Sequence, residues 1–400
     1  MWPLKLTLLW RLKRKQIMPA TSPDYIATIL TQISDVSAAD WDALIPGGHH
    51  PFLTHRFLNA VEASGCTGGE TGWMPRHIWV EDEAGQVVGA APLYVKSHSQ
   101  GEYVFDHGWA DAMMRAGMDY YPKLQCSVPF TPATGPRLLA QTDDARKAVV
   151  SAMMQACSEW GMSGLHLTFL TEEDRGVLKG MGFAAREDRQ FHFINRGYAD
   201  FDAFLDSLSS RKRKNIRKER KAAQDGVTIR RLTGDDLKNK HWDIFYQCYL
   251  DTSARKWGRP YLNRAFFDQM QQTMRDDIIL VMAWQDDTPI AAALNYIGGE
   301  ALYGRNWGAL VHKPFLHFEL CYYQAIDAAL ELGLSRVEAG AQGEHKLARG
   351  YEPIATHSAH WLTHPGLMTA VEDYLDRERL AVEHEINILA QHTPFKKASE

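Results

Sequence analysis

Three side chains that carry charge or exchange protons stand on consecutive residues late in the chain: Glu344, His345 and Lys346. They follow the short apolar segment 336–340, which predicts a β-strand, and they lie in a polar loop that runs to Gly350. Ligands are commonly bound just beyond such strand ends in α/β sheets. The sequence therefore predicts a site at this loop, built from a carboxylate, an imidazole and an amine.

Two further candidates stand on a predicted helix just before that strand. The apolar segment 289–297 predicts one strand, 301–307 predicts the returning strand, and the helix covers 316–332. His317 and Glu319 fall in the first turn of this helix, and both are candidates for proton transfer. The structural alternative is that Glu319 only complements the positive end of the helix dipole and that the histidines are ordinary structural residues.

The densest cluster of charge covers residues 211–221, where eight of the side chains are cationic. Most such runs are simply solvated faces. This run contains one aliphatic residue, Ile216, and thus almost no face with which to pack. We predict that it binds a phosphate-bearing ligand. The residues assigned to this donor-binding surface are Arg211, Lys212, Lys214, Arg217 and Lys218.

A second basic segment, 254–261, interleaves cations with aromatic residues. Aromatic rings stack on nucleotide bases while cations neutralise phosphates, so this composition suits a nucleotide or a polyphosphate. Lys256, Trp257 and Arg259 are therefore predicted to join the phosphate-binding surface.

The first half of the chain holds a loop-rich stretch at about 96–150, with prolines, threonines and aromatic residues at 129–137. Such a segment predicts a rigid loop with a polar, stackable surface, although its aromatics could equally cap the core of the first domain. The predicted substrate-binding residues are Tyr121, Lys123, Thr131, Thr134 and Arg137 in this stretch, together with Tyr303, Arg305 and Trp307 on the strand 301–307.

The chain contains an internal repeat. Thr28-Ile29 and Trp41 recur in the same order as Thr228-Ile229 and Trp242, and the segment 88–95 matches 290–297. In both halves a helix then closes on a glycine before another strand. The mixture of hairpins and crossover helices predicts an α/β fold with mixed sheets. We expect domains at 25–198, with the insertion at about 96–150, and at 199–400, which ends in a long helix.

Composition limits the classes of function. The chain has 400 residues and a net charge of −5, which indicates a globular protein with room for two cores and no general affinity for nucleic acid. The five cysteines lack metal-ligand spacing, and no metal site is predicted. No apolar run is long enough to cross a bilayer. Residues 1–24 are expected to be disordered or to follow a mis-called start, although the basic, apolar segment 1–18 could make weak contact with a membrane surface.

The motifs described above resemble those of the FemAB-like group of tandem GNAT proteins, the superfamily named for N-acetyltransferases. The segment 209–217 is similar to the basic helix that opens the second half of these proteins. The run 315–350 resembles their helix, strand and lysine-containing loop, and 130–137 resembles their proline-rich segment. In layout the resemblance covers roughly residues 25–395. It implies two tandem GNAT-like domains related by internal duplication.

The resemblance also implies a transferase in which an amine attacks an activated acyl or aminoacyl donor to form an amide bond. Such a reaction needs aligned reactants, a proton acceptor and a stabilised oxyanion. Lys346 matches the family's loop lysine, and we expect it to place positive charge on the carbonyl or on a nearby phosphate. Glu344 or Glu319 would be the base, with His317 and His345 as alternates.

Two donors stay open: aminoacyl-tRNA, as in Fem-type enzymes that act on cell-wall precursors, and acyl-CoA, as in other GNAT proteins. The glycine-rich pyrophosphate loop of the acyl-CoA group is not reproduced before the helix at 316. We expect no tightly bound cofactor, a small-molecule or peptide acceptor, tRNA as a candidate partner, and a cytoplasmic location. A different class of function, a non-catalytic module that binds a nucleotide, a tRNA or a cell-wall fragment, would need the basic run but no base near Lys346.

Overall fold

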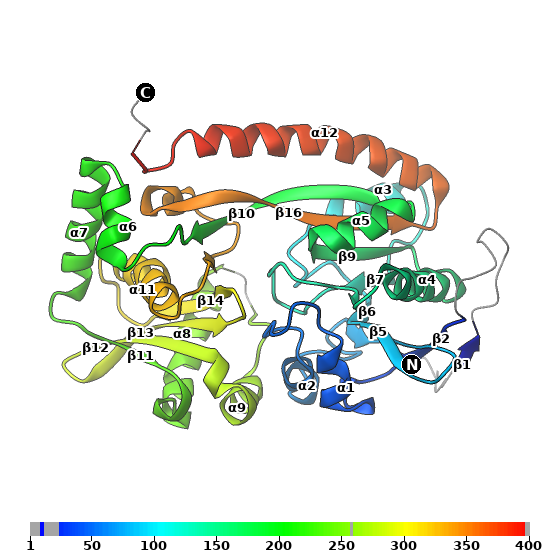
Figure 1. The fold of residues 1–400 in the computed structure, drawn as a ribbon, viewed down its shortest axis with the longest axis horizontal. Helices are drawn as coiled ribbons and strands as arrows, with labels where there is room; N and C mark the ends of the chain where they lie inside the picture. Colours follow the sequence, from blue (N-terminus) through cyan, green and yellow to red (C-terminus); the bar gives the residue numbers. More distant parts are fainter. Residues whose placement is uncertain (1–8, 12–23, 257–258, 397–400) are drawn as a thin grey trace. The chain divides into compact units, whose positions relative to one another are not determined.

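A computed structural model describes residues 9–11, 24–256 and 259–396 of the chain. The chain forms two compact units, one from 1–187 with 356–379 and the other from 188–355 with 380–400. Both units combine strands with helices (Figure 1), which confirms the predicted mixed α/β class. Within the described ranges, no helix has both the length and the apolar character required to span a membrane. Most of the predicted N-terminal segment 1–24 lies outside the described residues.

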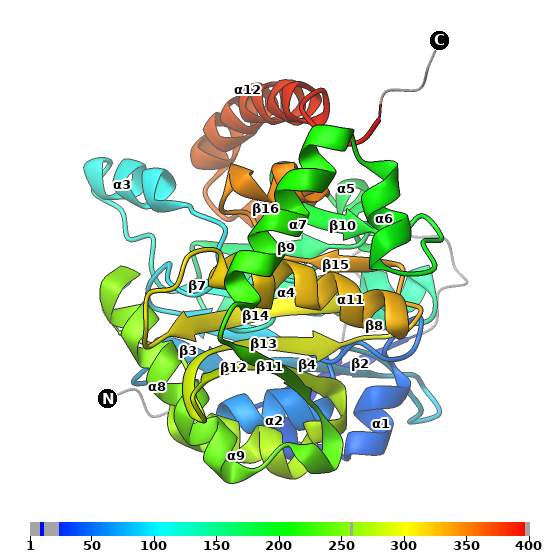
Figure 2. The same ribbon diagram turned by 90° about the vertical axis from the view of Figure 1, so that its left-hand side faces the viewer.

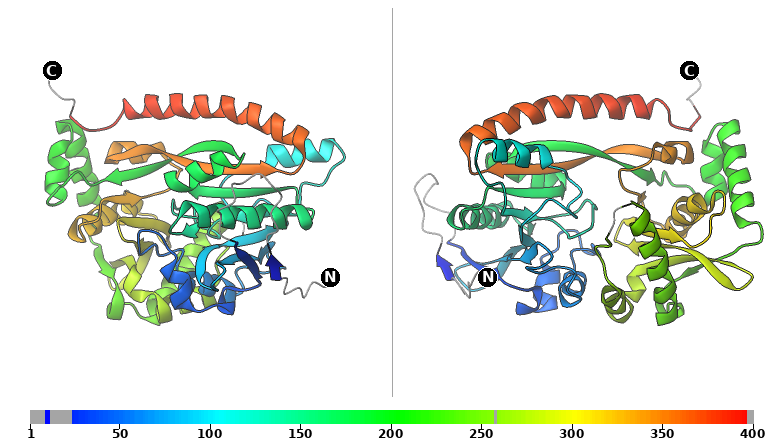
Figure 3. Two further views of the ribbon diagram at one scale, coloured as in Figure 1. Left: turned by 45° about the vertical axis from the view of Figure 1, so that its right-hand side comes forward. Right: turned by 180° about the vertical axis from the view of Figure 1, so that it is seen from behind.

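The first unit contains two groups of strands and the helices that pack on them. Its elements are β1 (Leu9–Arg11), β2 (Ile26–Leu30), α1 (Ala38–Ala43), α2 (His55–Ala63), β3 (Trp73–Pro75), β4 (His77–Glu81), β5 (Val87–Ala91), β6 (Leu93–Lys96), α3 (His107–Arg115), β7 (Lys123–Cys126), β8 (Leu139–Ala140), α4 (Asp143–Glu159), β9 (Gly164–Leu170) and α5 (Glu172–Gly180). Helix α4 packs on β4, β5 and β9. Helices α1 and α2, drawn in blue, lie on the other side of the strands from α4 (Figures 1 and 3).

The second unit holds most of the sequence-predicted site. Its elements are α6 (Phe201–Ser207), α7 (Ser210–Gln224), β11 (Thr228–Leu232), α8 (Asn239–Lys256), α9 (Arg264–Thr273), β12 (Ile278–Gln285), β13 (Thr288–Ile297), β14 (Ala301–Ala309), α10 (Leu316–Phe318), the π-helical turn η4 (Glu319–Tyr323), α11 (Gln324–Glu331), β15 (Arg336–Glu338) and the 3-10 helix η5 (Glu344–Arg349). Three elements run from one unit into the other: β10 (Ala184–Ile194), β16 (Tyr351–Leu362) and α12 (Pro365–Ala390).

The strands of the second unit are buried on both faces, as their nearly continuous apolar sequences require. Helices α7 and α11 cover one face, and α8 and α9 cover the other (Figure 2). The approach of α8 to β14 is so close that a Cβ at Gly308 would lie 2.0 Å from the Cys248 carbonyl oxygen. A glycine is therefore required there for the helix to pack on the strand.

The two units repeat one order of strands. In the first, β2–β4, β4–β5 and β6–β7 are antiparallel pairs and β7–β9 is parallel. In the second, β11–β12, β12–β13 and β13–β14 are antiparallel and β14–β15 is parallel. Trp41 and Trp242, which the sequence comparison aligns, are both completely buried. These pairings agree with the internal repeat, and the division into two domains at residue 198 stays a prediction.

The last strand of each repeat pairs with a strand of the other repeat. The chain leaves β9, passes through α5 and enters β10, whose residues 192–194 pair with β15 in the second unit. It leaves β15, passes through η5 and enters β16, whose residues 357–362 pair with β9 in the first unit. Each compact unit is consequently discontinuous in sequence, whereas the sequence analysis expects two continuous halves. Strand composition does not reveal such an exchange, because both strands are buried in either arrangement.

Candidate functional site

Lys346 lies where the sequence analysis expects it, just beyond the end of β15. Its side chain is buried, and its Nζ donates hydrogen bonds to the carbonyl oxygens of Ala339 and Gly340, the second at 3.0 Å. Nζ also lies 5.8 Å from the centre of the Phe191 ring. Lys346 therefore ties the first turn of the polar loop to the end of the strand and brings a positive charge to that point.

The polar loop is anchored from a second side by Arg349. This residue donates to both carboxylate oxygens of Glu219 on α7 at 2.9 Å and to the His345 carbonyl oxygen at 2.7 Å. Its guanidinium lies 3.4 Å from the centre of the Phe318 ring. A charge-assisted pair in a half-buried setting is stronger than an exposed one, so η5 is held firmly between β15 and α7.

The predicted histidines gather with aromatic rings beside this loop. The His317 ring lies 4.6 Å from Trp307 and 5.9 Å from His345, measured between ring centroids. His345 Nε2 is 3.0 Å from the Tyr322 hydroxyl, whose pKa burial raises. The β13–β14 pairing has a register shift between Ala293 and Asn295, so one extra residue of β14 lies between their partners Trp307 and Gly304. The structure thus brings together His317, His345 and Trp307 from the predicted set.

Glu319 has a structural environment that differs from the one expected of a base. It is completely buried at the start of the π-helical turn. Its oxygens accept hydrogen bonds from Arg220 at 3.1 and 3.2 Å, and Oε1 also accepts from Gln224 and Gln324. Because both oxygens accept hydrogen bonds and Arg220 neutralises the charge, this arrangement favours a role as the buried anion that docks α7 on the helix. The side chain of Glu344 lies outside the described residues.

Helix α7 divides its charges between two faces. Ile216, Glu219 and Arg220 turn inward. Arg211, Lys214, Lys218 and Lys221 are exposed, and over the described residues none of the four forms an ion pair. Of the other assigned cations, Lys212 is half-buried and Arg217 pairs with Asp202 at 3.0 Å.

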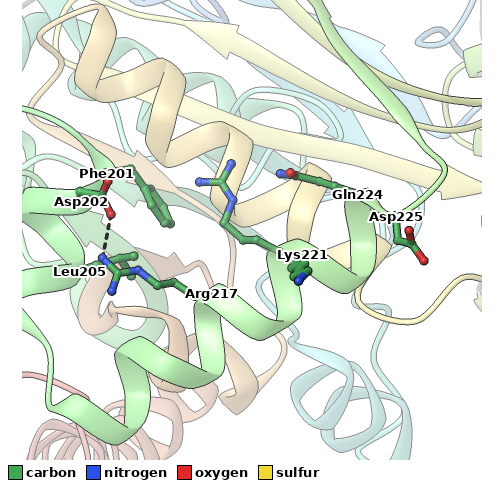
Figure 4. Close-up of a pocket in the computed structure, with 8 residues that line it drawn as sticks. Phe201, Asp202, Leu205, Arg217, Lys221, Gln224 and Asp225 are labelled. Carbon is green, nitrogen blue, oxygen red and sulfur yellow. Dashed lines mark hydrogen bonds and ion pairs between the residues drawn. The ribbon is translucent and has the colours of Figure 1, made fainter.

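An open pocket of about 660 Å³ runs along α7 within the second unit. Phe201, Asp202 and Leu205 of α6 line one end, with Arg217 facing Asp202, and Gln224 and Asp225 line the other (Figure 4). The pocket also includes Arg220 and Lys221. It therefore combines cations with one aromatic ring, Phe201, above which the Arg220 guanidinium lies at 4.3 Å.

The remaining predicted phosphate-binding residues are further along the chain. Arg259 is exposed, directly after the segment 257–258. Lys256 ends helix α8, but its side chain lies outside the described residues, as does Trp257. Their assignment to the phosphate-binding surface stays a prediction.

Lys123, predicted to bind substrate, lies inside the first unit and is 1% exposed. Its Nζ contacts Asp106 Oδ2 at 2.5 Å, Glu102 Oε1 at 3.0 Å and the Ser99 hydroxyl at 2.8 Å. Burial acts to lower the pKa of Lys123, but the two carboxylates outweigh it and raise that pKa above its ordinary value. This environment favours a structural role, and Tyr121 joins it by donating to Ser99 at 2.8 Å.

The proline-rich segment is also built into the first unit. Arg137 is completely buried and donates hydrogen bonds to the carbonyl oxygens of Thr168, Gly135 and Ala133. Thr131 is buried with its hydroxyl on the Pro129 carbonyl, and the Thr134 carbonyl oxygen lies 3.0 Å from His50 Nε2. These contacts favour the structural alternative, in which the segment closes the core of the first unit.

A buried histidine pair makes the first unit sensitive to acid. His166 Nδ1 lies 2.9 Å from His360 Nδ1, and burial, reinforced by Lys123, lowers the pKa of His166 to about 3. The unfolded chain takes up a proton at this residue near pH 6.5 while the folded chain does not, so the free energy of unfolding falls as the pH falls below 6.5.

We expect His166 to remove about 3 kcal/mol from the free energy of unfolding between pH 7 and pH 4.5, since each pH unit corresponds to about 1.4 kcal/mol. Urea denaturation at the two pH values measures this difference. In the His166→Gln variant the free energy of unfolding should depend less steeply on pH, because about one proton fewer is taken up on unfolding. An unchanged slope in the variant would show that His166 does not take up its proton on unfolding.

Three polar residues form a row across the sheet of the second unit: Tyr303, which the sequence analysis predicts to bind substrate, and Glu338 and His192, which it misses. Tyr303 on β14 is the register partner of Glu338 on β15, and Glu338 is the partner of His192 on β10. All three are buried. The sequence does carry a signal for this row, because Gln190 and His192 alternate with Phe191 and Phe193, which indicates a buried strand with one polar face.

No group of histidine, cysteine, aspartate or glutamate side chains in the described part of the chain could hold a metal ion. The site consists of a basic helix, a polar loop fixed by Lys346 and Arg349, and a buried polar row at the end of β15. Such a site can bind an anion and carry acid–base chemistry.

Comparison with known proteins identifies the fold. The crystal structure of FemX superposes with a TM-score of 0.52 at 13% identity, over 84% of this chain and 98% of that one. The C-terminal domain of a protein described as a lysylphosphatidylglycerol synthetase, from Agrobacterium fabrum, superposes with a TM-score of 0.54 at 8% identity, over 84% and 95% of the two chains. No curated protein matches the chain in sequence.

The family follows from the sequence itself. The sequence model of the FemAB-like family, described as peptidoglycan biosynthesis/recognition, matches residues 32–397. This match covers both units, and it confirms the predicted resemblance and the predicted class of enzyme, an acyl- or aminoacyltransferase. The chain belongs to the FemAB-like family.

Proposed function

We propose that this protein transfers an aminoacyl group from aminoacyl-tRNA to an amine on the peptide of a peptidoglycan precursor. The observation that carries the choice of donor is the outer face of α7. Arg211, Lys214, Lys218 and Lys221 are exposed there, without an ion-pair partner among the described residues, beside an open pocket. Only a polyanion uses such a surface fully, since each phosphate that binds releases counterions.

The position of the cations on α7 strengthens this reading. Arg211, Lys212 and Arg213 occupy the first turn of the helix, which contains no acidic residue. Cations at a helix N-terminus oppose the helix dipole and destabilise the helix by a few tenths of a kcal/mol each. A bound phosphate backbone would reverse this penalty. Helix α7 therefore carries charges that help binding more than they help folding.

An acyl-CoA donor has less support. The segment 310–315, between the end of β14 and the helix at Leu316, contains no glycine. Phe315 itself adopts a left-handed conformation, with φ of 65°. A pyrophosphate is usually held by a glycine-rich turn whose backbone N–H groups point at the phosphates. Both features disfavour that arrangement here.

The reaction requires little covalent chemistry from the protein. The amine nitrogen of the acceptor attacks the ester carbonyl of the aminoacyl-tRNA, the N–C bond forms, and the C–O bond to the ribose breaks. One proton must leave the amine and one must reach the ribose oxygen. In this proposal Lys346 supplies positive charge near the carbonyl or a phosphate. Aminoacyl-tRNA is a cytoplasmic donor, which agrees with the predicted location.

The triple variant Arg211→Glu, Lys214→Glu, Lys218→Glu tests the donor. We expect tRNA binding to be lost in the variant at near-physiological salt, because three attractive contacts become repulsive. For the unmodified protein, affinity should fall by about three orders of magnitude per tenfold rise in salt if four cations each contact a phosphate. Filter binding or fluorescence anisotropy with a mixture of tRNAs measures both.

A matched control changes net charge by the same amount elsewhere. Lys179, Lys238 and Lys240 are exposed and lie outside α7, and their replacement by Glu should weaken tRNA binding only slightly. Equal losses in the two triple variants, or binding that does not respond to salt, would contradict the assignment of α7 as the donor-binding surface.

A further inference from the structure

We propose that His192 is the general base of the transfer reaction and that Gln190 and Glu338 position it. This inference rests on the proposed function and names the group that would accept the proton of the attacking amine. Two alternates lie nearby, His317 on α10 and His345 in the polar loop, but both lie in the aromatic cluster, and His345 Nε2 is within hydrogen-bond distance of Tyr322.

The location of His192 supports the assignment. His192, Glu338 and Tyr303 are register partners on β10, β15 and β14, so their side chains share one face of the sheet. The pairing of β14 with β15 covers only residues 301–303 and 336–338. Beyond this row the two strands are no longer paired, and residues 304–307 and 339–340 are partly exposed. The row therefore lies where the pairing of β14 with β15 ends, next to partly exposed residues of both segments.

The predicted loop lysine lies at the same end. Lys346 holds the carbonyl oxygens of Ala339 and Gly340, the two residues that directly follow Glu338. A base at His192 and a positive charge at Lys346 would therefore act at one strand end. The charge of Lys346 acts on His192, and aminolysis of an ester requires both a proton acceptor and a stabilising positive charge.

The hydrogen bonds of His192 leave one ring nitrogen available. Nε2 lies 3.3 Å from Gln190 Oε1 and 3.9 Å from Glu338 Oε2. Both neighbours are acceptors, so Nε2 carries the hydrogen and the lone pair of the neutral ring is on Nδ1. In the part of the chain that the structure describes, Nδ1 has no hydrogen-bond partner. A histidine in this tautomer can accept a proton at Nδ1.

His77 shows how a structural histidine differs in this protein. It is completely buried, its Nε2 lies 2.7 Å from Glu62, and its Nδ1 accepts a hydrogen bond from the Leu93 N–H at 3.2 Å. Both nitrogens of His77 are satisfied, which leaves it no capacity to accept a proton from a substrate. It matches His192 in residue type, burial and the presence of a carboxylate neighbour, and it is the natural control.

The charges around His192 keep it neutral at rest. Burial lowers the pKa of His192, Arg336 on β15 and Lys346 in η5 lower it further, and Glu338 acts in the opposite direction. A base must be unprotonated to begin the reaction, so a lowered pKa suits the role. Glu338 Oε2 is buried and has no hydrogen-bond partner in the described residues. It is placed to stabilise the imidazolium that forms when the proton arrives.

The proposed step balances without a co-reactant. As the amine nitrogen bonds to the carbonyl carbon, its proton passes to His192 Nδ1 and the ring becomes an imidazolium. Collapse of the tetrahedral intermediate breaks the C–O bond, and the same proton passes to the ribose oxygen that leaves. His192 returns to its neutral form, the peptide gains an amide bond, and the tRNA leaves with a free hydroxyl.

The test uses the full chain with aminoacyl-tRNA and a peptidoglycan precursor. His192→Gln should lower kcat by about 10²- to 10⁴-fold, the usual contribution of a general base, while KM changes little. His77→Gln should retain kcat within about threefold, whatever it does to stability. Circular dichroism and the unfolding temperature establish that each variant is folded. A folded His192→Gln enzyme with an undiminished kcat would overturn the proposal.

A second variant remains informative if His192→Gln does not fold. Glu338 raises the pKa of His192. Glu338→Gln should therefore move the acidic limb of the kcat profile to lower pH, because the base then loses its proton more easily. An acidic limb that stays in place would overturn the proposal, since a purely structural carboxylate would not move it. If the unmodified protein transfers nothing from aminoacyl-tRNA, the proposed function is wrong. If the unmodified protein is active and folded His192→Gln is equally active, only the assignment of His192 as the base is wrong.

Discussion

Replacing Lys123 by methionine is expected to lower the free energy of unfolding by about 3 to 5 kcal/mol. The ammonium group lies between Asp106 and Glu102, and all three side chains are at most 3% exposed. Burial acts to raise the pKa of Asp106, and Lys123 more than reverses this, so the carboxylate is charged in the folded chain. Methionine would fill the space but leave the buried Asp106 carboxylate without its cation, while Glu102 would keep Lys96 Nζ at 3.4 Å.

Urea denaturation of the two proteins measures this difference. Lys147→Met is the control, because Lys147 pairs with Asp144 at 3.3 Å on the surface, where its side chain is 45% exposed. Exposed pairs contribute about 0 to 1 kcal/mol, so the control should remain within that range. If Lys123→Met were as stable as the control and instead impaired acceptor binding, Lys123 would be the substrate-binding residue that the sequence analysis predicts.

Replacing Lys346 by methionine is expected to reduce the rate of transfer at least tenfold, or about 1.4 kcal/mol of barrier, in a folded protein. The substitution removes the positive charge at the end of β15. It also leaves the carbonyl oxygens of Ala339 and Gly340 without their donor, so the polar loop would lose one of its two anchors. The second anchor, Arg349 on Glu219, keeps η5 attached to α7.

Steady-state kinetics with aminoacyl-tRNA as donor measure the effect of Lys346→Met. Lys313→Met serves as the matched control, because Lys313 also donates to a backbone carbonyl, that of Asp225 at 2.7 Å, but from an exposed position outside the loop. Its rate should remain within about twofold. A fully active Lys346→Met enzyme would remove Lys346 from the mechanism.

The sequence predicts the secondary structure around the site closely. The helix expected at 316–332 is observed from Leu316 to Glu331, and the strand expected at 336–340 is observed at Arg336–Glu338. Both segments carry strong local signals, an apolar period of a helix and a glycine stop in one case and a short apolar run in the other. The π-helical turn inside the helix has no such signal, because it arises from how Glu319 and its neighbours pack.

The roles of individual residues are harder to predict, because composition does not reveal burial. Lys123 and Arg137 lie in a loop-rich stretch of polar residues, which suggests exposure, yet both are inside the first unit. Their charges are satisfied by partners such as Asp106 and the Thr168 carbonyl oxygen. Long-range partners of this kind depend on the tertiary fold and leave no pattern in the local sequence.

The same limit explains why His192 escapes a reading of the sequence. It is distant in sequence from Glu338, and β10 joins β15 only through the exchange of the final strands. A search for reactive residues near Lys346 therefore finds His345, its neighbour in sequence, and His317, on the helix just before the strand. The alternation of Gln190 and His192 with phenylalanines marks a polar face on a buried strand, but it does not name the partner strand.

The central claim is that aminoacyl-tRNA is the donor, and mass spectrometry of a transfer reaction tests it most directly. The purified full chain would be incubated with a peptidoglycan precursor that carries a free amine, and with either a mixture of aminoacyl-tRNAs or acetyl-CoA. With aminoacyl-tRNA we predict a precursor heavier by one amino-acid residue, a product that ribonuclease treatment of the donor abolishes, and no product with acetyl-CoA. Acetylation of the precursor by acetyl-CoA, with no product from aminoacyl-tRNA, would contradict the account.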